Sequence, residues 1–294
     1  MALQPGPKQV HDIPLFGNRA IYALTADGTL KFGLSGTGAN RTDVYFYGNT
    51  ASDYLFLDAS KNEITLAGAM HINNEAAVTF FDDFIGERTA ANLESCGYTT
   101  VVAAGGSIAT VAAVNGTVVL TNDTTDDDTQ QLSHELNWQA ENVIVFEARV
   151  KVDDITNVGM FVGMTDALNE TTPNLPVGRS AATVTSTATD CVGFVFDTDS
   201  TTDKWFGIGV KTDVDTAQIG DTIAPVNDTY QRLRIEITAA GVASFFINGT
   251  AYGAATAAAV APAVSLTPYI GLANRSGTAH AMTVDYIYVS SKRE

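Results

Sequence analysis

The sequence is poor in charged residues and very poor in cysteine. Charged residues make up 17% of its 294 positions, and 16 Lys and Arg face 33 Asp and Glu, which gives a formal net charge of −17. That excess of negative charge repels nucleic acid and anionic lipid, so we expect neither nucleic acid nor a membrane as a partner. The two cysteines, Cys96 and Cys191, are too few for a disulfide framework or a four-cysteine zinc site.

Long apolar runs and helical periodicity are missing as well. No apolar run reaches the length of about 18 residues that a membrane span needs. The first residues lack the apolar region of a secretory signal, so we expect no signal peptide. No long segment keeps the i, i+3, i+4, i+7 apolar pattern of an amphipathic helix, which argues against a helical fold.

The sequence instead contains a succession of short segments with the two-residue period of β-strands. In Val143–Val152 one face carries Ile144, Phe146, Ala148, Val150 and Val152, and the other carries Glu147, Arg149 and Lys151. Gln231–Ile237 repeats this alternation. Both segments predict strands with one buried and one solvated face.

Other segments are apolar on both faces or are joined by a turn signal. Asn248-Gly249 between two apolar runs is a strong hairpin signal, because both residues tolerate a positive φ. Short strands separated by Gly, Asn and Asp turns predict an all-β protein in which residues 76–294 form a β-sandwich or jelly roll. The segments expected to be central strands are Val158–Met164, Cys191–Phe196 and Trp205–Val210.

Residues 1–18 are expected to form an extended arm. Three of the eight prolines, Pro5, Pro7 and Pro14, lie there, and proline fits neither a helix interior nor a central strand. The arm is either an unordered terminus or a segment that orders against a neighbouring subunit. In the second case its apolar contacts would come from Val10, Ile13, Leu15 and Phe16.

Residues 19–75 are expected to form a small β module for attachment or oligomerisation. Its short strands, such as Asp43–Tyr47 and Asp53–Leu57, carry large apolar groups on both faces. One small sheet cannot cover two apolar faces, so the rest of the chain or further copies must do so. The residues expected to make capsid or oligomer contacts here are Tyr45, Tyr47, Tyr54 and Phe56.

Three segments near the end of the sequence resemble a known fold family. Phe245–Thr250, Tyr269–Leu272 and Val284–Val289 are similar to the strands of concanavalin-like (laminin-G-like) jelly rolls. Phe81-Asp82-Asp83-Phe84 fits the start of such a domain. The resemblance implies a concanavalin-like β-sandwich over residues 76–294.

A second resemblance concerns the small β module. Asp43–Gly48, Asp53–Asp58 and Asn62–Leu66 resemble a β module of tailed-bacteriophage virion proteins, found in trimeric fibres, head fibres and capsid-decoration proteins. It implies a protein made in the host cytoplasm and placed on the outer capsid surface of the virion. Its expected partners are the major capsid protein and its own copies in a homotrimer.

Two functions follow from these resemblances. The first is a non-enzymatic capsid decoration (cement) protein, which stabilises the shell by binding it. The alternative is a head or tail fibre whose jelly roll binds a host surface glycan.

Catalytic and metal chemistry find little support in the sequence. Concanavalin-like hydrolases carry two carboxyls on one strand face, as in Glu-x-Asp-x-Glu, and this pattern is absent, so we predict no enzyme and no catalytic residues. No cofactor is expected. Calcium is the alternative to a solvated turn at Asp197, Asp199 and Asp203. Trp138, between polar neighbours, is the candidate platform for a sugar ligand.

Overall fold

The protein is nearly all β, which confirms the predicted fold class. The computed structural model describes residues 77–85, 93–103, 105–111, 116–135, 137–168, 173–220, 222–255 and 257–293, and it describes five earlier strands by their backbone. The chain divides into two compact units, Met1–Asn73 and Asn74–Glu294. In the described part of the chain, no helix is long and apolar enough to cross a membrane.

The first unit contains two small antiparallel sheets. One pairs β1 with β2, and the other has the order β3-β4-β5. The arm residues Val10, Ile13, Leu15 and Phe16 lie outside the described residues. The strands are β1 (Tyr22–Leu24), β2 (Leu30–Phe32), β3 (Val44–Tyr47), β4 (Tyr54–Asp58) and β5 (Glu63–Ala67).

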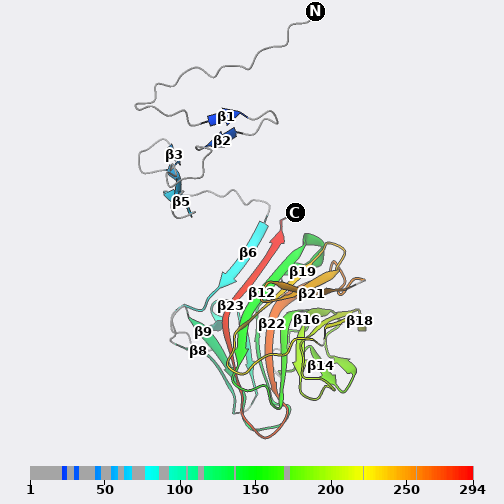
Figure 1. Cartoon of the computed structure of the whole chain (residues 1–294). Helices are drawn as coiled ribbons and strands as arrows, with labels where there is room; N and C mark the ends of the chain where they lie inside the picture. The colour runs from blue at the N-terminus through cyan, green and yellow to red at the C-terminus, as the bar shows by residue number, and fades with distance from the viewer. Residues whose placement is uncertain are drawn as a thin grey trace, which may run out of the picture. The chain divides into compact units, whose positions relative to one another are not determined.

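The second unit is a sandwich of two eight-stranded antiparallel sheets (Figure 1). One sheet, here called the β22 sheet, has the order β18-β17-β16-β13-β22-β10-β7, with β11 also paired to β22. Its strands are β7 (Thr99–Val102), β10 (Thr129–Ser133), β11 (Trp138–Gln139), β13 (Val158–Thr165), β16 (Cys191–Asp197), β17 (Phe206–Lys211), β18 (Val214–Gly220) and β22 (Ser265–Asn274).

The other sheet, here called the β23 sheet, has the order β21-β20-β19-β12-β23-β9-β8, with β6 also paired to β23. The first and last strands of the unit are therefore neighbours, and the register pairs Asp82 with Ile287 and Ala77 with Lys292. Its strands are β6 (Ala77–Asp82), β8 (Ser107–Val111), β9 (Thr117–Thr121), β12 (Ile144–Val152), β19 (Gln231–Ile237), β20 (Ala243–Ile247), β21 (Thr250–Ala254) and β23 (Ala281–Lys292). A single 3₁₀ turn, Ala140–Asn142, precedes β12.

The main core lies between the two sheets. In β12 the buried side chains alternate with partly exposed ones, as its sequence predicts. Phe146 from β12, Phe194 from β16 and Phe245 from β20 are fully buried, and the rings of Phe194 and Phe245 meet edge to face with centroids 5.4 Å apart. The sandwich is thus closed by large apolar side chains contributed by both sheets.

A second apolar cluster covers the outer face of the β22 sheet. A small hairpin of β14 (Val177–Ser180) and β15 (Thr183–Ser186) contributes Val177 and Val184, which pack with Phe161 and Tyr269 of the sheet. The rings of Phe161 and Tyr269 lie 5.7 Å apart. This cover explains why the central strands of the β22 sheet are apolar on both faces.

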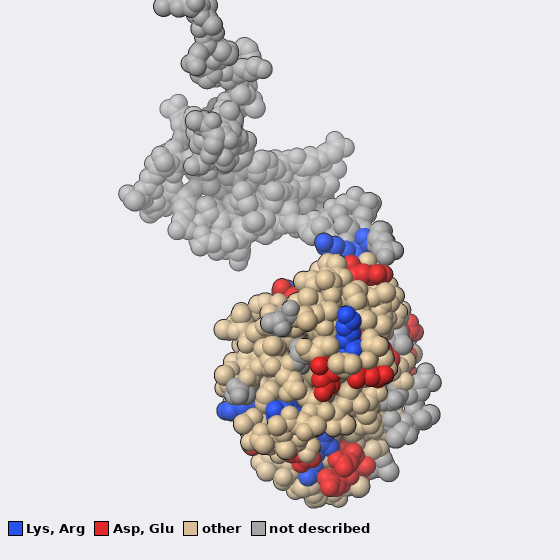
Figure 2. All heavy atoms as spheres, turned by 90° about the vertical axis from the view of Figure 1, so that its right-hand side faces the viewer, with Lys and Arg blue, Asp and Glu red and all other residues tan. Residues whose placement is uncertain are grey.

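Charge is divided unequally between the two units. Residues 1–73 hold five Lys or Arg and six Asp or Glu, a net charge of −1, so residues 74–294 hold −16 of the total −17. Most of the surface turned to the viewer in Figure 2 is nonetheless uncharged. Any cluster of basic side chains on the second unit therefore stands out from its surroundings.

Candidate functional site

Of the three aspartates named for calcium, the alternative to a solvated turn, two lie beside Arg275. Asp197, fully buried, accepts hydrogen bonds from Nε and Nη2 of Arg275, both at 2.9 Å. A carboxylate oxygen of Asp199 lies 3.6 Å from Arg275 Nε, and Asp203 is exposed. Over the residues that the structure describes, no group of three His, Cys, Asp or Glu side chains could hold a metal ion. The carboxylate of Asp197 instead forms an ion pair with Arg275, which joins the ends of β16 and β22.

Trp138 is wrong as an exposed sugar platform. Its side chain is 6% exposed and belongs to the main core. The physical reason is the two-residue period of β11: Gln139 points outward, where it donates to the carbonyl of Ala263, and Trp138 points inward. Because neighbouring residues of a strand face opposite ways, the polar neighbours of Trp138 indicate that its own side chain faces the core.

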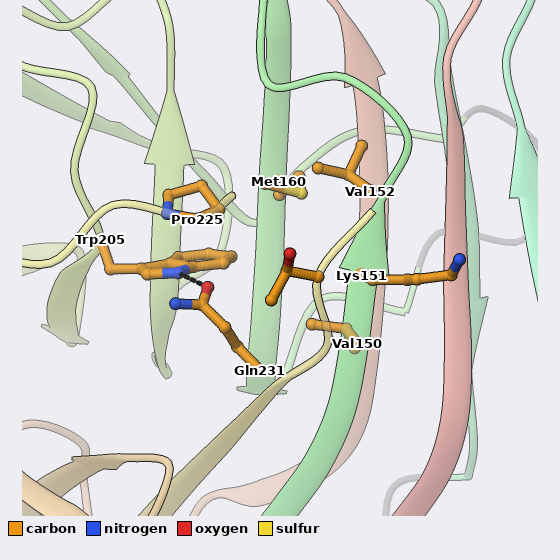
Figure 3. Close-up of a pocket in the computed structure, with 8 residues that line it drawn as sticks. Val150, Lys151, Val152, Met160, Trp205, Pro225 and Gln231 are labelled. Atoms are coloured by element: carbon orange, nitrogen blue, oxygen red, sulfur yellow. Dashed lines mark hydrogen bonds between the residues drawn. The ribbon is translucent and has the colours of Figure 1, made fainter. Parts of the chain in front are cut away.

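Trp205, the other tryptophan, is also buried, as its apolar strand predicted. Its indole Nε1 donates a hydrogen bond of 2.7 Å to Oε1 of Gln231 (Figure 3). Beside this pair lies a cavity of about 10 Å³, lined among others by Met160 and Pro225. That volume suits a single water molecule, so the cavity is no ligand site.

The predicted contact residues of the first unit are brought together by strand pairing. In the register of β3 and β4, Tyr45 pairs with Phe56 and Tyr47 pairs with Tyr54. The contacts predicted for these residues with a capsid or with other copies remain predictions.

An open groove lies at the edge of the β22 sheet, between the β14–β15 hairpin and the turn from β17 to β18. Its lining combines hydroxyl and carboxylate groups with two valines, and none of its lining residues is aromatic. The lining residues are Val184, Thr185, Ser186, Asp213, Val214 and Asp215.

The outer face of the β23 sheet is the richer candidate. Because β12 and β19 alternate, Glu147, Arg149, Arg232 and Arg234 all point away from the core. These four residues are neighbours in the register, which pairs Glu147 with Arg234 and Arg149 with Arg232. The sequence predicted their outward orientation correctly, without assigning them a ligand.

A β-bulge adds two consecutive outward residues to this face. The register of β12 and β23 shifts between Arg149 and Val150, so Asp285 has no partner of its own beside Tyr286. Asp285 and Tyr286 are both partly exposed, while the residues on either side are buried. Bulges re-aim side chains in this way and are common next to functional sites.

Aromatic rings line the same face. The side chain of Phe81 on β6 is 58% exposed, and its ring lies 5.8 Å from that of Tyr286. Tyr288 pairs with Phe81 on one side and with Glu147 on the other. Tyr230 is less accessible, because the Arg149 guanidinium lies 4.1 Å above its ring.

Hydrogen bonds and ion pairs hold the polar groups of this face in place. The Tyr286 hydroxyl donates to Glu147 Oε1 at 2.6 Å, and Arg149 Nη1 lies 2.6 Å from Asp285 Oδ2. Burial and the hydrogen bond to Glu147 raise the pKa of Tyr286 to about 12, so its hydroxyl stays protonated near neutral pH. The face therefore combines aromatic rings, hydroxyl donors, guanidinium donors and carboxylate acceptors.

We call this surface the β23 face and define it by its members on four strands. Sequence reasoning missed the two tyrosines and Phe81 as members. The sequence feature that could have indicated the tyrosines is Asp285-Tyr286, two consecutive polar residues that interrupt the apolar alternation of the last strand. The members are Phe81, Glu147, Arg149, Lys151, Arg232, Arg234, Glu236, Asp285, Tyr286 and Tyr288.

Comparison with known proteins assigns the fold. No family model and no curated protein matches the sequence. Among solved structures, a protein of unknown function from Shewanella oneidensis MR-1 is similar with a TM-score of 0.54 and 14% identity, covering 78% of this chain and 97% of that chain. LamA from Z. galactanivorans, crystallised with laminaritriose and laminaritetraose, is similar with a TM-score of 0.53 and 12% identity, covering 74% and 99%.

Peanut lectin is a third similar structure, with a TM-score of 0.50 and 13% identity over 74% of this chain and 99% of the lectin. Identities this low establish the fold alone, and the fold is the predicted concanavalin-like jelly roll. The resemblance of the first unit to phage virion proteins is not addressed by these structures.

The comparison also corrects the prediction that the chain is not an enzyme. The solved structures that share the fold include laminarinase domains, so the fold is one that carries catalysis. The prediction was wrong because it treated one missing pattern, Glu-x-Asp-x-Glu, as excluding every enzyme of this fold. Its absence excludes only that arrangement of carboxyls.

Proposed function

We propose that the chain is a bacteriophage particle protein whose jelly roll binds carbohydrate through the β23 face. The observation that carries the proposal is the row of side chains across that face. Phe81, Tyr288, Glu147 and Arg234 stand opposite one another on four adjacent strands, so that aromatic groups lead directly into charged ones.

Carbohydrate needs this combination of groups. A sugar ring has apolar C–H faces, which pack on exposed aromatic rings, and a rim of hydroxyls, which exchange hydrogen bonds with fixed polar groups. Phe81 supplies an exposed ring next to Tyr286. Glu147 is already held by the Tyr286 hydroxyl and by Arg234, so little freedom of these side chains is lost on binding.

The fold neighbours support the proposal at the level of the fold. LamA was crystallised with laminari-oligosaccharides, and peanut lectin is named as a lectin. The outer face of the β22 sheet is a weaker candidate for a carbohydrate site, because the β14–β15 hairpin covers it.

The location on a phage particle rests on the resemblance of residues 43–66 to virion β modules. On this proposal the first unit attaches the chain to the major capsid protein and to its own copies, as a decoration protein or a fibre. A trimer would present three β23 faces, and multivalent binding would compensate for a weak single site.

Binding to a glycan array, followed by calorimetry with the full chain, tests the carbohydrate proposal. We expect Phe81→Ala to weaken binding by about tenfold, because the variant loses roughly 50 Å² of apolar contact at about 25 cal/mol per Å². Val214→Ala, which changes an exposed valine in the groove, is the matched control and should leave binding unchanged. The same samples are assayed for new reducing ends, which would reveal cleavage of the ligand.

Two results would contradict the proposal. One is an array on which no glycan binds. The other is binding that Val214→Ala abolishes and Phe81→Ala leaves intact, which would place the site in the groove.

The location is tested separately, by rebinding the full chain to stripped particles with and without residues 1–18. Copy number per particle then separates a decoration protein, present in many copies, from a fibre. A chain that binds no particle in either form would refute the location but not the carbohydrate site.

A further inference from the structure

Basic side chains concentrate on the β23 face although the unit is strongly acidic. Four of the 16 Lys and Arg residues of the chain, Arg149, Lys151, Arg232 and Arg234, lie on β12 and β19 of this one face. Lys151 pairs with the exposed Asp228 at 3.4 Å. Three carboxylates, those of Glu147, Glu236 and Asp285, lie beside the arginines on the same face.

Two of these arginines stand directly opposite each other. The register pairs Arg149 on β12 with Arg232 on β19, and like charges in that relation destabilise a sheet. Asp285 engages Arg149 on its other side, at 2.6 Å. Arg234 pairs with Glu236 at 2.8 Å, so among the described residues Arg232 is the arginine of this face whose carboxylate partner lies farthest away.

Arg232 holds its carboxylate partner loosely. Its Nε lies 3.9 Å from Glu147 Oε2, which is longer than a hydrogen bond, and Glu147 is shared with Arg234 and the Tyr286 hydroxyl. The side chain of Arg232 is 46% exposed, the largest exposed fraction among the three arginines of the face. Its planar guanidinium is suited to a bidentate contact with a carboxylate from solution.

The distance between the aromatic and the basic parts of the face suits an oligosaccharide. Three strand spacings, or about 14 Å across the strands, separate Phe81 on β6 from Arg234 on β19, and Arg232 lies two residues further along β19. A chain of a few sugar residues can contact both parts of the face.

We infer that the ligand of the β23 face is an acidic glycan, a chain that contains uronic acid residues. Its carboxylate would lie between Arg232 and Arg149, while a neighbouring sugar ring packs on Phe81. This inference rests on the proposed carbohydrate function and specifies the class of sugar.

Pairs of oligosaccharides that differ only in the carboxylate test the inference. The first pair is β-1,4-linked oligoglucuronate and the cello-oligosaccharide of equal length, and the second is oligogalacturonate and its methyl ester. Calorimetry with the full chain at low salt should give about tenfold tighter binding for the acidic member of at least one pair. The preference should shrink in about 0.5 M NaCl, because salt screens exposed charges.

Variants separate the acidic preference from binding itself. We expect Arg232→Gln to weaken binding of the acidic member by about tenfold and to leave the neutral member within about twofold. Arg232→Lys should keep part of the preference, since it retains the charge without the planar fork. Phe81→Ala should weaken both members, and Lys204→Gln, in the loop between β16 and β17, should weaken neither.

Each outcome decides a specific claim. Equal binding of both members in both pairs, with loss in Phe81→Ala, refutes the acidic ligand and leaves the carbohydrate site standing. A preference that persists unchanged in Arg232→Gln also refutes the inference. Absence of binding by all four oligosaccharides overturns the inference, and an array without hits overturns the proposed function with it.

Discussion

Replacing Arg275 with alanine is expected to destabilise the second unit strongly, because it leaves a buried carboxylate without its charge partner. Arg275 follows β22 and its side chain is 13% exposed, whereas Asp197 at the end of β16 is 1% exposed. Burial disfavours the charged form of Arg275, but the hydrogen bond and charge of Asp197, with Asp127 and Asp199, outweigh it and raise the pKa of Arg275.

The room for this ion pair comes from a missing side chain. Gly159 on β13 pairs directly with Asp197, and a Cβ at Gly159 would lie 3.0 Å from Arg275 Nη2. The guanidinium therefore lies over the glycine, with both of its hydrogen bonds to Asp197 at 2.9 Å. Nη1 of Arg275 lies 2.6 Å from Oδ1 of Asp127, so Arg275 also holds the turn before β10 in place.

The expected loss of stability in Arg275→Ala depends on the hydrogen bonds that Asp197 keeps. Removing one member of a buried ion pair costs about 3–5 kcal/mol. Asp197 still accepts the backbone N–H groups of Arg179 and Asp199, and Arg275 is partly solvated, so we take the lower end, about 3 kcal/mol. For a unit of this size that corresponds to a fall in Tm of about 6–12 °C.

Tryptophan fluorescence during urea unfolding measures this change in the second unit alone. The only two tryptophans, Trp138 and Trp205, are buried in its core, so their emission follows that unit. Lys292→Ala, at an exposed position near the end of β23, is the control and should change stability by less than about 0.5 kcal/mol. In an Asp197→Asn background, Arg275→Ala should cost markedly less. A loss below about 1 kcal/mol, or an equal loss in both backgrounds, would refute the account of a charge-dependent pair.

Three further predictions follow from the core and its turns. Both tryptophans should emit at short wavelength and resist quenching by iodide in the folded protein, since neither Trp138 nor Trp205 is more than 6% exposed; ready quenching of either would place it at the surface. Gly116→Ala should cost about 2 kcal/mol or more in urea unfolding, because Gly116 has a φ of 70° and a Cβ there would collide with the backbone of Phe84; a change of stability near zero would contradict this. Burial lowers the pKa of His134 below its ordinary value, so the unfolded chain binds a proton first as the pH falls below about 6.5, and Tm should drop further there in the natural protein than in His134→Gln; parallel pH profiles would contradict it.

Much of the sandwich could be predicted from local patterns. Gln231–Ile237 is a strand at the predicted bounds, and the predicted hairpin turn after β20 has positive φ at both Asn248 and Gly249. These segments carry their own signal, because the two-residue period and the turn residues are local properties of the chain.

Strands with weak local patterns were not predicted. β10 reads Thr-Gln-Gln-Leu-Ser, yet all five of its residues are buried, because β22 and β7 flank it and neighbouring strands satisfy its backbone. The β14–β15 hairpin was missed for the opposite reason, since its alternation is short and its contribution is to cover Phe161 and Tyr269. In both cases the deciding partner is remote in the sequence.

The residues of the candidate site also differ in whether a local pattern or a remote partner strand determines their orientation. The outward positions of Glu147 and Arg149 were predicted from period alone, because every second residue of an isolated alternating strand faces one way. The bulge that adds Asp285 and Tyr286 was not, since a bulge is defined by the register against a second strand.

The same register argument shows why Asp197 and Asp285, two aspartates at strand positions, have such different roles. Asp197 ends β16 opposite a glycine, so the guanidinium of Arg275, which follows β22, pairs with it inside the protein and its carboxylate is not open to a ligand. Asp285 is the extra residue of a bulge on an uncovered face, where its carboxylate holds Arg149 within reach of solvent. The spacing of acidic residues in the sequence made the first aspartate a candidate calcium ligand, as the alternative to a solvated turn. Strand pairing favours the second, because only there does an ion pair lie on a surface that a ligand can approach.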